Sequence, residues 1–168
     1  MNIRVANIKD FPTVFSLVET VIEDMNRQKI DQWDDIYPNE EVLKSDIENN
    51  SLYVIEKADK ITGITVLNEH QEAEYKNIIW KYSGGNVLVV HRLSVHPDFQ
   101  GQGIARELMK FAEHYAEENR YDLIRLDAFK NNQNAVSLYE KAGYHLAGTV
   151  TFRKGEFYCF EKEIKAKH

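Results

Sequence analysis

The sequence contains little cysteine and proline, and it has no long apolar run. Cys159 is the single cysteine among 168 residues, so no disulfide can form within the chain, which is compatible with a reducing cytoplasm. Only 3 prolines are present, and neither a Pro/Gly/Ser-rich linker nor an internal repeat divides the chain, which predicts one domain over residues 1–168. No apolar run approaches the ~20 residues that a membrane-spanning helix needs. We therefore expect a cytoplasmic protein without a membrane partner.

The sequence also has fewer basic residues than acidic ones. The 21 lysines and arginines are outnumbered by 27 aspartates and glutamates, which gives a formal net charge of −6. Proteins that bind nucleic acid need an excess of positive charge to neutralise phosphates, so we expect no nucleic-acid partner. The negative charge suits the attraction of a cationic amine, although it serves solubility equally well.

Hydrophobic periodicity predicts a mixture of strands and helices. Apolar or alternating segments typical of strands are residues 3–5, 51–56, 61–67, 87–95, 123–127, 144–152 and 156–164. Segments with the apolar spacing of a helix are residues 10–25, 39–47, 103–118 and 134–142. We expect Asp10 and Asn39 to cap the first two helices, and residues 68–86 to form a polar loop. Parallel pairing of strands across the helix at 103–118 predicts an α/β or α+β fold with a single sheet.

The segment Gln100–Ala105 contains two glycines and joins the predicted strand 87–95 to the predicted helix 103–118. Glycine lets backbone N–H groups approach a ligand closely, and a helix start offers unpaired N–H donors and the positive end of a dipole. The loop therefore predicts a cradle for a diphosphate, with Arg106 as an additional cationic contact. The third glycine of the dinucleotide-binding fingerprint and the Lys-Ser/Thr pair of the P-loop are both missing, so neither of those nucleotide sites fits.

The same loop resembles the Q/R-x-x-G-x-G/A signature of the GNAT superfamily of acetyl-CoA-dependent N-acetyltransferases. The preceding residues 93–97 resemble the strand end that comes before this signature in the family. Residues 132–144 resemble the later family segment N-x-x-A-x-x-L-Y-E-K-x-G-F, with Tyr144 in place of the usual phenylalanine. The similarity is detailed over roughly residues 50–150 and extends to residues 1–50 only in general layout.

This resemblance implies a central mixed sheet of about six or seven strands, about four flanking helices, and acetyl-CoA as co-substrate without a metal. In the family, the pantetheine arm lies between two splayed parallel strands, here 87–95 and 123–127, and pairs with backbone groups of the first. The loop takes the diphosphate. The positions implied to bind acetyl-CoA are Leu93, Ser94, Val95, Gln100, Gly101, Gln102, Gly103, Ile104, Ala105, Arg106, Asn132 and Tyr139.

The resemblance also suggests catalytic residues. Tyr139 matches the tyrosine near the thioester sulfur that is often assigned as general acid; the alternative is an apolar contact on a short helix. Many members carry a basic glutamate where this chain has Val89, which cannot take a proton. His91 lies on the same strand face, and arylalkylamine acetyltransferases have a histidine at its place. A structural His91, Asp127 acting through water, and the lack of a dedicated base remain open alternatives.

The acceptor side is marked by aromatic and acidic residues. Trp33 and Tyr37 stand among several aspartates in the first helical region, which usually walls the acceptor pocket in this family, and that combination suits a cationic amine. A packed tryptophan in a solvated loop is the alternative. The acidic residues around His70 match no metal-binding spacing, and we interpret them as part of a polar loop.

Sequence and resemblance together predict acetyl transfer from acetyl-CoA to a primary amine by direct attack in a ternary complex. The acceptor is expected to be a small amine, an amino acid or a peptide N-terminus. The alternative is a non-catalytic acyl-CoA-binding regulatory module on the same fold. Many relatives in the family dimerise, so we also consider a homodimer.

Overall fold

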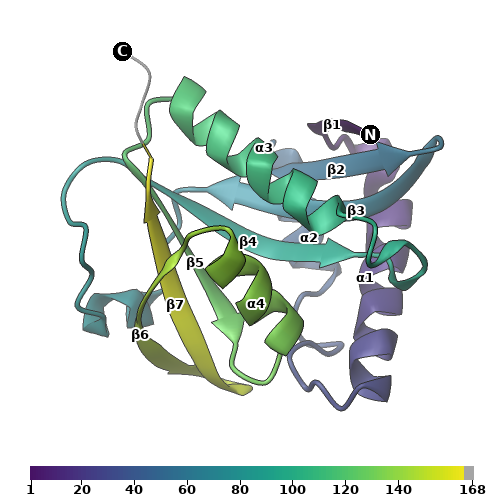
Figure 1. Cartoon of the computed structure of the whole chain (residues 1–168). Helices are drawn as coiled ribbons and strands as arrows, with labels where there is room; N and C mark the ends of the chain where they lie inside the picture. The colour runs from purple at the N-terminus through teal and green to yellow at the C-terminus, as the bar shows by residue number, and fades with distance from the viewer. Residues whose placement is uncertain (165–168) are drawn as a thin grey trace. The chain divides into compact units, whose positions relative to one another are not determined.

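The chain is described here over residues 1–164 by a computed structural model (Figure 1). Within these residues, seven strands are hydrogen-bonded in the order β1-β2-β3-β4-β5-β7-β6. The β4–β5 pair is parallel, whereas the pairs β1–β2, β2–β3, β5–β7 and β6–β7 are antiparallel. Together with four α-helices, this confirms the predicted mixed sheet. The last residues of the predicted domain, 165–168, lie outside the described part of the chain.

The chain divides into two compact units. Within the described residues, the first unit comprises residues 1–67 and 92–111, and the second comprises residues 68–91 and 112–164. β4 (Val87–Val95) and α3 (Ile104–Glu118) each contribute residues to both units. The single-domain organisation suggested by the sequence stays a prediction.

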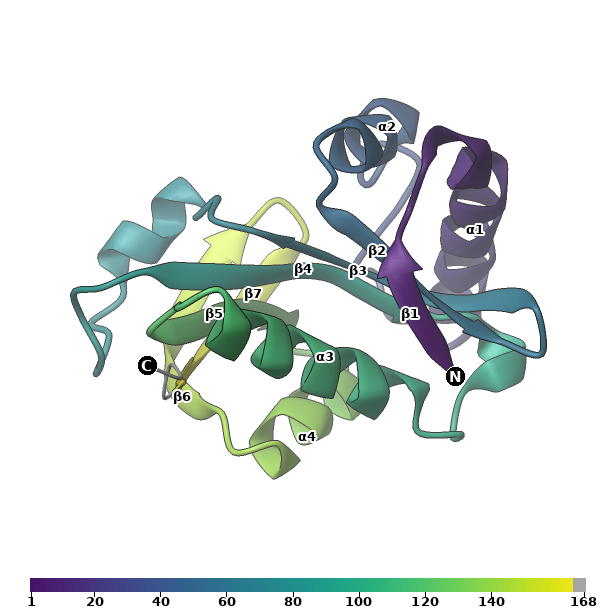
Figure 2. The same ribbon diagram turned by 90° about the horizontal axis from the view of Figure 1, so that it is seen from above.

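The first unit is a layered structure with helices on both faces of its strands. It contains β1 (Asn2–Val5), α1 (Phe11–Arg27), α2 (Glu40–Glu48), β2 (Leu52–Lys57) and most of β3 (Lys60–Asn68). α1 and α2 lie on one face of these strands and the beginning of α3 lies on the other (Figure 2). Alternation along β2 explains both contacts, because Val54 packs in the α1–α2 core while the next residue, Ile55, packs against Ile104 and Leu108 of α3.

Side-chain caps define the helix starts of the first unit, although not all as predicted. Asn39 caps α2, since its Oδ1 accepts a hydrogen bond from the Val42 N–H at 3.0 Å. Asp10 stands at the cap position of α1, but its carboxylate makes no capping bond. It instead accepts bonds from the Arg4 guanidinium at 2.8 and 2.9 Å, so the predicted cap by Asp10 is wrong. The carboxylate also accepts the Asn7 N–H at 2.9 Å, which closes a capping box on the 3₁₀ helix Ile8–Asp10. Its oxygens are therefore already bonded on the N-terminal side of α1.

The second unit is built on β5 (Leu123–Phe129), α4 (Gln133–Lys141), β6 (His145–Phe152) and β7 (Gly155–Glu163). β5 pairs with β7 along its whole length, from Leu123 opposite Glu163 to Phe129 opposite Phe157. α4 packs on these strands (Figure 1), with the Tyr139 ring centroid 5.9 Å from that of Phe160. Gly143 follows the end of α4 with a φ of 88°, the left-handed conformation that glycine commonly adopts just after a helix. None of the helices in the described residues is long and apolar enough to cross a membrane.

Candidate functional site

β4 and β5 separate partway along their length. Their parallel ladder joins Val87–Val89 to Leu123–Arg125 and ends there, although β4 continues to Val95 and β5 to Phe129. Backbone groups beyond the ladder are thereby released from pairing between these two strands. The structure thus confirms the predicted splay of two parallel strands.

β4 is distorted at Arg92, immediately after the ladder ends. Arg92 has a φ of 50°, a left-handed backbone conformation that costs a non-glycine residue energy and is often found at functional sites. Its guanidinium donates two hydrogen bonds of 2.8 Å to Asp46 of α2, and both side chains are only 10% exposed. Burial raises the pKa of Asp46, and Arg92 partly offsets this rise. This buried pair fixes the distorted stretch of β4 to α2.

The same arginine holds Tyr37, one of the two predicted acceptor-side aromatics. Arg92 Nη1 donates to the Tyr37 hydroxyl at 2.6 Å, and the guanidinium lies 5.8 Å from the ring centroid. Tyr37 is 38% exposed. Trp33, the other predicted aromatic, is only 6% exposed and packs in the α1–α2 core, which favours the structural alternative for this residue. The sequence analysis did not predict that Arg92 and Asp46 form a buried pair. The feature that could have indicated it is an arginine within an otherwise apolar strand, because a buried arginine needs a partner.

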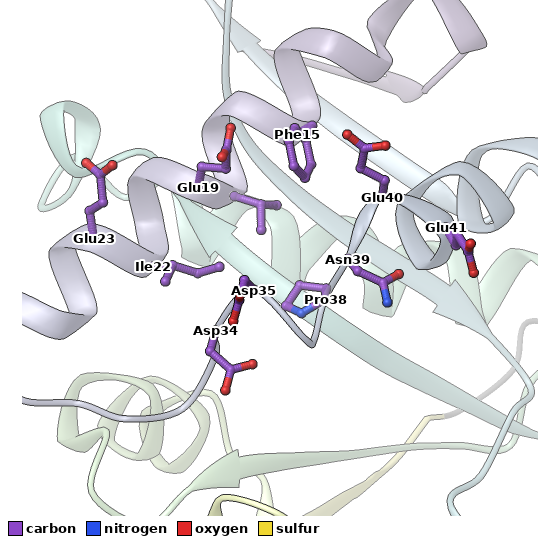
Figure 3. Close-up of a pocket in the computed structure, with 11 residues that line it drawn as sticks. Phe15, Glu19, Ile22, Glu23, Asp34, Asp35, Pro38, Asn39, Glu40 and Glu41 are labelled. Atoms are coloured by element: carbon purple, nitrogen blue, oxygen red, sulfur yellow. The ribbon is translucent and has the colours of Figure 1, made fainter.

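A cavity of about 510 Å³ lies in the first unit, between α1 and the residues that lead into α2 (Figure 3). Its apolar side is formed by Phe15, Val18 and Ile22 of α1. Six carboxylate side chains also line it: Glu19, Glu23, Asp34, Asp35, Glu40 and Glu41. Two of the aspartates near Trp33 and Tyr37 therefore border a pocket that combines apolar surface with negative charge.

The predicted phosphate cradle, residues 100–106, is called the glycine loop below. Gly101 and Gly103 have φ values of 77° and 79°, and no described atom lies within 4 Å of where a Cβ would stand on either residue. The open side of each glycine therefore faces space that a ligand can fill. α3 begins directly afterwards at Ile104, whose side chain is buried, so the first turn of this helix is fixed in place. These features fit the diphosphate of acetyl-CoA.

The strand residues before the glycine loop lie in two environments. Leu93 and Val95 are partly buried against the Ile55–Ile104 core of the first unit. Ser94 is 6% exposed, and its Oγ has no hydrogen-bond partner among the described residues. Gln100 donates from Nε2 to the Val95 carbonyl at 3.3 Å, and Lys57 donates to Gln102, so side-chain hydrogen bonds hold the first half of the loop. Ala105 is half-buried and Arg106 is exposed.

Tyr139 and Asn132, the two predicted cofactor contacts of the second unit, both belong to α4 or its cap. Tyr139 is 5% exposed and packs against Tyr144 and Phe160. Burial, and next the charge of Asp127, raise the pKa of Tyr139 well above its usual value, so the phenol is protonated at neutral pH. Asn132 caps α4 by accepting the Ala135 N–H at 3.2 Å, which gives it a structural role in addition to the predicted contact.

Asp127 lies on β5 and is held by a residue that the sequence analysis did not single out. The hydroxyl of Tyr75 donates to Asp127 Oδ2 at 2.6 Å, and Tyr75 is only 2% exposed. Burial raises the pKa of Tyr75, and the Asp127 charge adds to the effect, so Tyr75 stays a donor.

Cys159, opposite Asp127 on β7, is fully buried. Burial, and next the charge of Asp127, raise the pKa of the Cys159 thiol to about 12. Its thiol is thus unreactive, as a small apolar core residue would be.

His91 is half-buried on β4 and hydrogen-bonded within the second unit. Its Nε2 lies 2.8 Å from Oδ1 of Asn68, the last residue of β3. The ring of His70 lies 6.2 Å away between centroids, and His70 Nε2 is 3.5 Å from Glu72. Among the described residues no group of three or more histidine, cysteine, aspartate or glutamate side chains is arranged to hold a metal ion.

Residues 68–86, called the pinned segment below, are more ordered than the predicted polar loop. They contain a 3₁₀ helix at Ala73–Asn77. Glu161 of β7 is fully buried and accepts the backbone N–H groups of Lys81 at 2.8 Å and Tyr82 at 3.0 Å. Arg125 of β5 donates to Gln71 at 2.7 Å and to the Tyr82 carbonyl at 3.1 Å, and it lies over the Trp80 ring. Buried charged side chains on two strands therefore hold this segment at Gln71 and at residues 80–82.

Comparison with known proteins agrees with this geometry. Residues 18–144 match the family described as "Acetyltransferase (GNAT) family". The chain is 25% identical over 165 residues to a Bacillus subtilis protein named as the uncharacterized N-acetyltransferase YesJ, covering 95% of this chain and 88% of that protein.

Two solved structures show the same fold. A GNAT-family acetyltransferase from Streptococcus agalactiae superimposes with a TM-score of 0.86 at 23% identity, covering 99% of this chain and 96% of the other. YncA from Salmonella typhimurium, whose structure contains its cofactor acetyl-CoA, gives a TM-score of 0.73 at 15% identity, covering 100% of this chain and 96% of the other.

Proposed function

Because the chain belongs to the GNAT acetyltransferase family, we propose that it transfers the acetyl group of acetyl-CoA to a primary amine. The observation that carries this proposal is the glycine loop. Its two positive-φ glycines leave open space directly before the start of α3. Backbone N–H groups of a first helical turn have no partner within the helix, and the helix dipole favours an anion there. Residues 100–106 would bind the diphosphate with these groups, and exposed Arg106 would add positive charge.

The strand end before the loop would bind the pantetheine arm. The ladder to β5 stops at Val89, so backbone groups of Leu93 and Val95 are outside that ladder. An extended amide-containing arm can pair with such groups as another strand would. The buried Oγ of Ser94 is a further polar group for the same ligand, and the contact of Asn132 with the cofactor stays a prediction from the family resemblance.

The chemistry requires two proton-handling groups. The amine nitrogen forms a bond to the thioester carbonyl carbon, the carbon–sulfur bond breaks, and the new amide must lose one proton. His91 would take this proton, with Asp127 acting through water as the competing candidate. Tyr139 would donate a hydrogen bond to the departing sulfur. Because burial raises the pKa of Tyr139, complete proton transfer to a thiolate is unfavourable, and stabilisation by a hydrogen bond is its better-matched role.

The acceptor would be a cationic amine that loses its proton before attack. The acid-lined cavity beside α1 and the exposed ring of Tyr37 support this choice, since carboxylates and aromatic faces both attract ammonium groups. Small amines, amino acids and peptide N-termini all meet this description. We further propose that the enzyme works in the cytoplasm, in keeping with its lone, buried cysteine.

The test is a free-thiol assay with acetyl-CoA and a panel of small amines, amino acids and short peptides. Amine-dependent release of thiol and a matching acetylated product would support the proposal. Binding of acetyl-CoA without turnover of any amine would instead support a non-catalytic acyl-CoA-binding module and overturn the enzymatic function.

A further inference from the structure

Asn68 ends β3 and receives two hydrogen bonds on one atom. Its Oδ1 lies 3.0 Å from the backbone nitrogen of His70 and 2.8 Å from Nε2 of His91. All three residues belong to the second unit. An amide oxygen has two lone pairs, so it can accept both bonds at once.

The hydrogen bond from the His70 backbone N–H determines which atom carries the hydrogen in the contact between Asn68 and His91. A backbone N–H only donates, so the side-chain atom that faces it must be the oxygen of Asn68 and not its NH₂ group. The oxygen only accepts, and therefore Nε2 of His91 must carry the hydrogen in that contact. In a neutral imidazole, one nitrogen carries hydrogen and the other accepts a proton. Neutral His91 is consequently the Nε2–H tautomer, in which Nδ1 is the proton-accepting atom.

We propose that Asn68 is a positioning residue that holds His91 in this tautomer and orients Nδ1 to take the amine proton. The inference rests on the proposed acetyltransferase function and on His91 as its base. In the step itself, a proton passes from the nitrogen of the attacking amine to Nδ1, and His91 becomes an imidazolium that keeps its Nε2–H bond to Asn68. Fixing the tautomer matters because the wrong one would present an N–H donor where an acceptor is needed.

Three titratable groups of the second unit bear on this pair. The His70 ring lies 6.2 Å from the His91 ring between centroids, and its Nε2 is 3.5 Å from the Glu72 carboxylate. Asp127, the competing candidate base, lies on the parallel strand β5, where the Tyr75 hydroxyl holds it. Substitution of Asn68 leaves all of these groups in place. A change in the tautomer or the titration of His91 between variants therefore reports on residue 68.

The direct test is ¹⁵N NMR of the imidazole nitrogens in the full-length protein, which distinguishes Nε2–H from Nδ1–H. We expect wild-type His91 to be the Nε2–H tautomer. Asn68→Leu, which removes the acceptor at similar size, should give a mixture of tautomers. Asn77→Leu, an exposed substitution on the pinned segment, is the control and should leave the spectrum of His91 unchanged. An Nδ1–H tautomer in the wild type, or an unchanged tautomer in Asn68→Leu, would overturn the inference.

Kinetics provide the second readout. Asn68→Leu should lower kcat/KM for the amine by about 10- to 100-fold, the usual range for loss of a supporting hydrogen bond, with KM for acetyl-CoA unchanged. Asn68→Asp keeps an acceptor oxygen and adds a negative charge that stabilises the imidazolium. It should therefore restore activity at high pH and move the acid limb of the pH profile to higher pH. An unmoved acid limb would count against the positioning role.

The two proposals fail in different ways. If the wild-type protein acetylates no amine in the panel, the proposed function fails, yet NMR still decides whether Asn68 sets the tautomer. If the protein is an active acetyltransferase and Asn68→Leu has the wild-type tautomer and pH profile, the inference about Asn68 fails alone.

Discussion

The glycine loop and the pinned segment are both irregular connections, but they are held by opposite means. The glycine loop, residues 100–106, owes its shape to the backbone: two glycines with positive φ and a helix that begins at once. The pinned segment, residues 68–86, owes its shape to side chains far away in the sequence, chiefly Glu161, Arg125 and Asp127. We infer that the glycine loop serves ligand binding, whereas the pinned segment serves the stability of the second unit.

This contrast leads to a ranking of effects on stability. Changes to the buried groups that hold the pinned segment should destabilise the protein strongly. Changes to exposed side chains of the glycine loop should affect ligand binding and leave the free energy of unfolding almost unchanged.

The largest effect is expected for Glu161→Ala. The substitution removes a fully buried carboxylate and leaves the N–H groups of Lys81 and Tyr82 without their acceptor, which should cost about 3 kcal/mol of unfolding free energy. Glu161→Gln keeps an acceptor oxygen and should cost less. Glu163→Ala, an exposed glutamate on the same strand, is the matched control. Chemical denaturation measures all three, and a Glu161→Ala value within about 0.5 kcal/mol of the control would contradict the pinning.

A middle-sized effect is expected for Tyr75→Phe. The variant loses only the hydroxyl that donates to Asp127 at 2.6 Å, in a side chain that is 2% exposed. We expect a loss of about 1–2 kcal/mol, because a carboxylate loses a buried donor. Tyr82→Phe removes a hydroxyl from a half-buried residue of the same segment and serves as control. Equal unfolding midpoints for the two variants in urea would remove Tyr75 from the set of pinning residues.

The smallest effect is expected for Gln102→Ala in the glycine loop. Its bond from Lys57 is exposed to solvent, and an exposed bond of this kind is worth little. The free energy of unfolding should change by less than about 0.5 kcal/mol. A loss as large as that of Tyr75→Phe would show that the glycine loop also carries stability, and the contrast between the two connections would disappear.

The same contrast explains what the sequence could reveal. The glycine loop, the helix after it and the end of α4 at Gly143 follow from local rules, because glycine spacing and apolar periodicity are visible within a few residues. The Asn39 cap is local in the same way. The splay of β4 and β5 was accessible through resemblance to the family.

The features that the sequence did not reveal depend on contacts between residues that are distant in the sequence. Nothing local distinguishes Asn68 as the partner of His91, or Asp46 as the partner of Arg92, since each pair forms only when separate elements pack. The predicted cap by Asp10 fails in part for the same reason, because Arg4 of β1 binds its carboxylate, which the nearby Asn7 N–H also occupies. The burial of Trp33 in the α1–α2 core is likewise a product of packing between elements, and its place beside the acceptor stays a prediction.

The central claim, that the glycine loop binds the diphosphate of acetyl-CoA, is tested most directly by calorimetric titration of two matched variants. Gly103→Trp and Gly84→Trp introduce the same side chain at glycines with φ values of 79° and 83°, each without a described atom within 4 Å of the added Cβ. Backbone strain is thus equal, and both variants should remain folded by circular dichroism. We expect Gly103→Trp to weaken acetyl-CoA binding by at least about 100-fold, or ~2.7 kcal/mol, while Gly84→Trp binds like the wild type. Wild-type affinity in a folded Gly103→Trp protein would contradict the account.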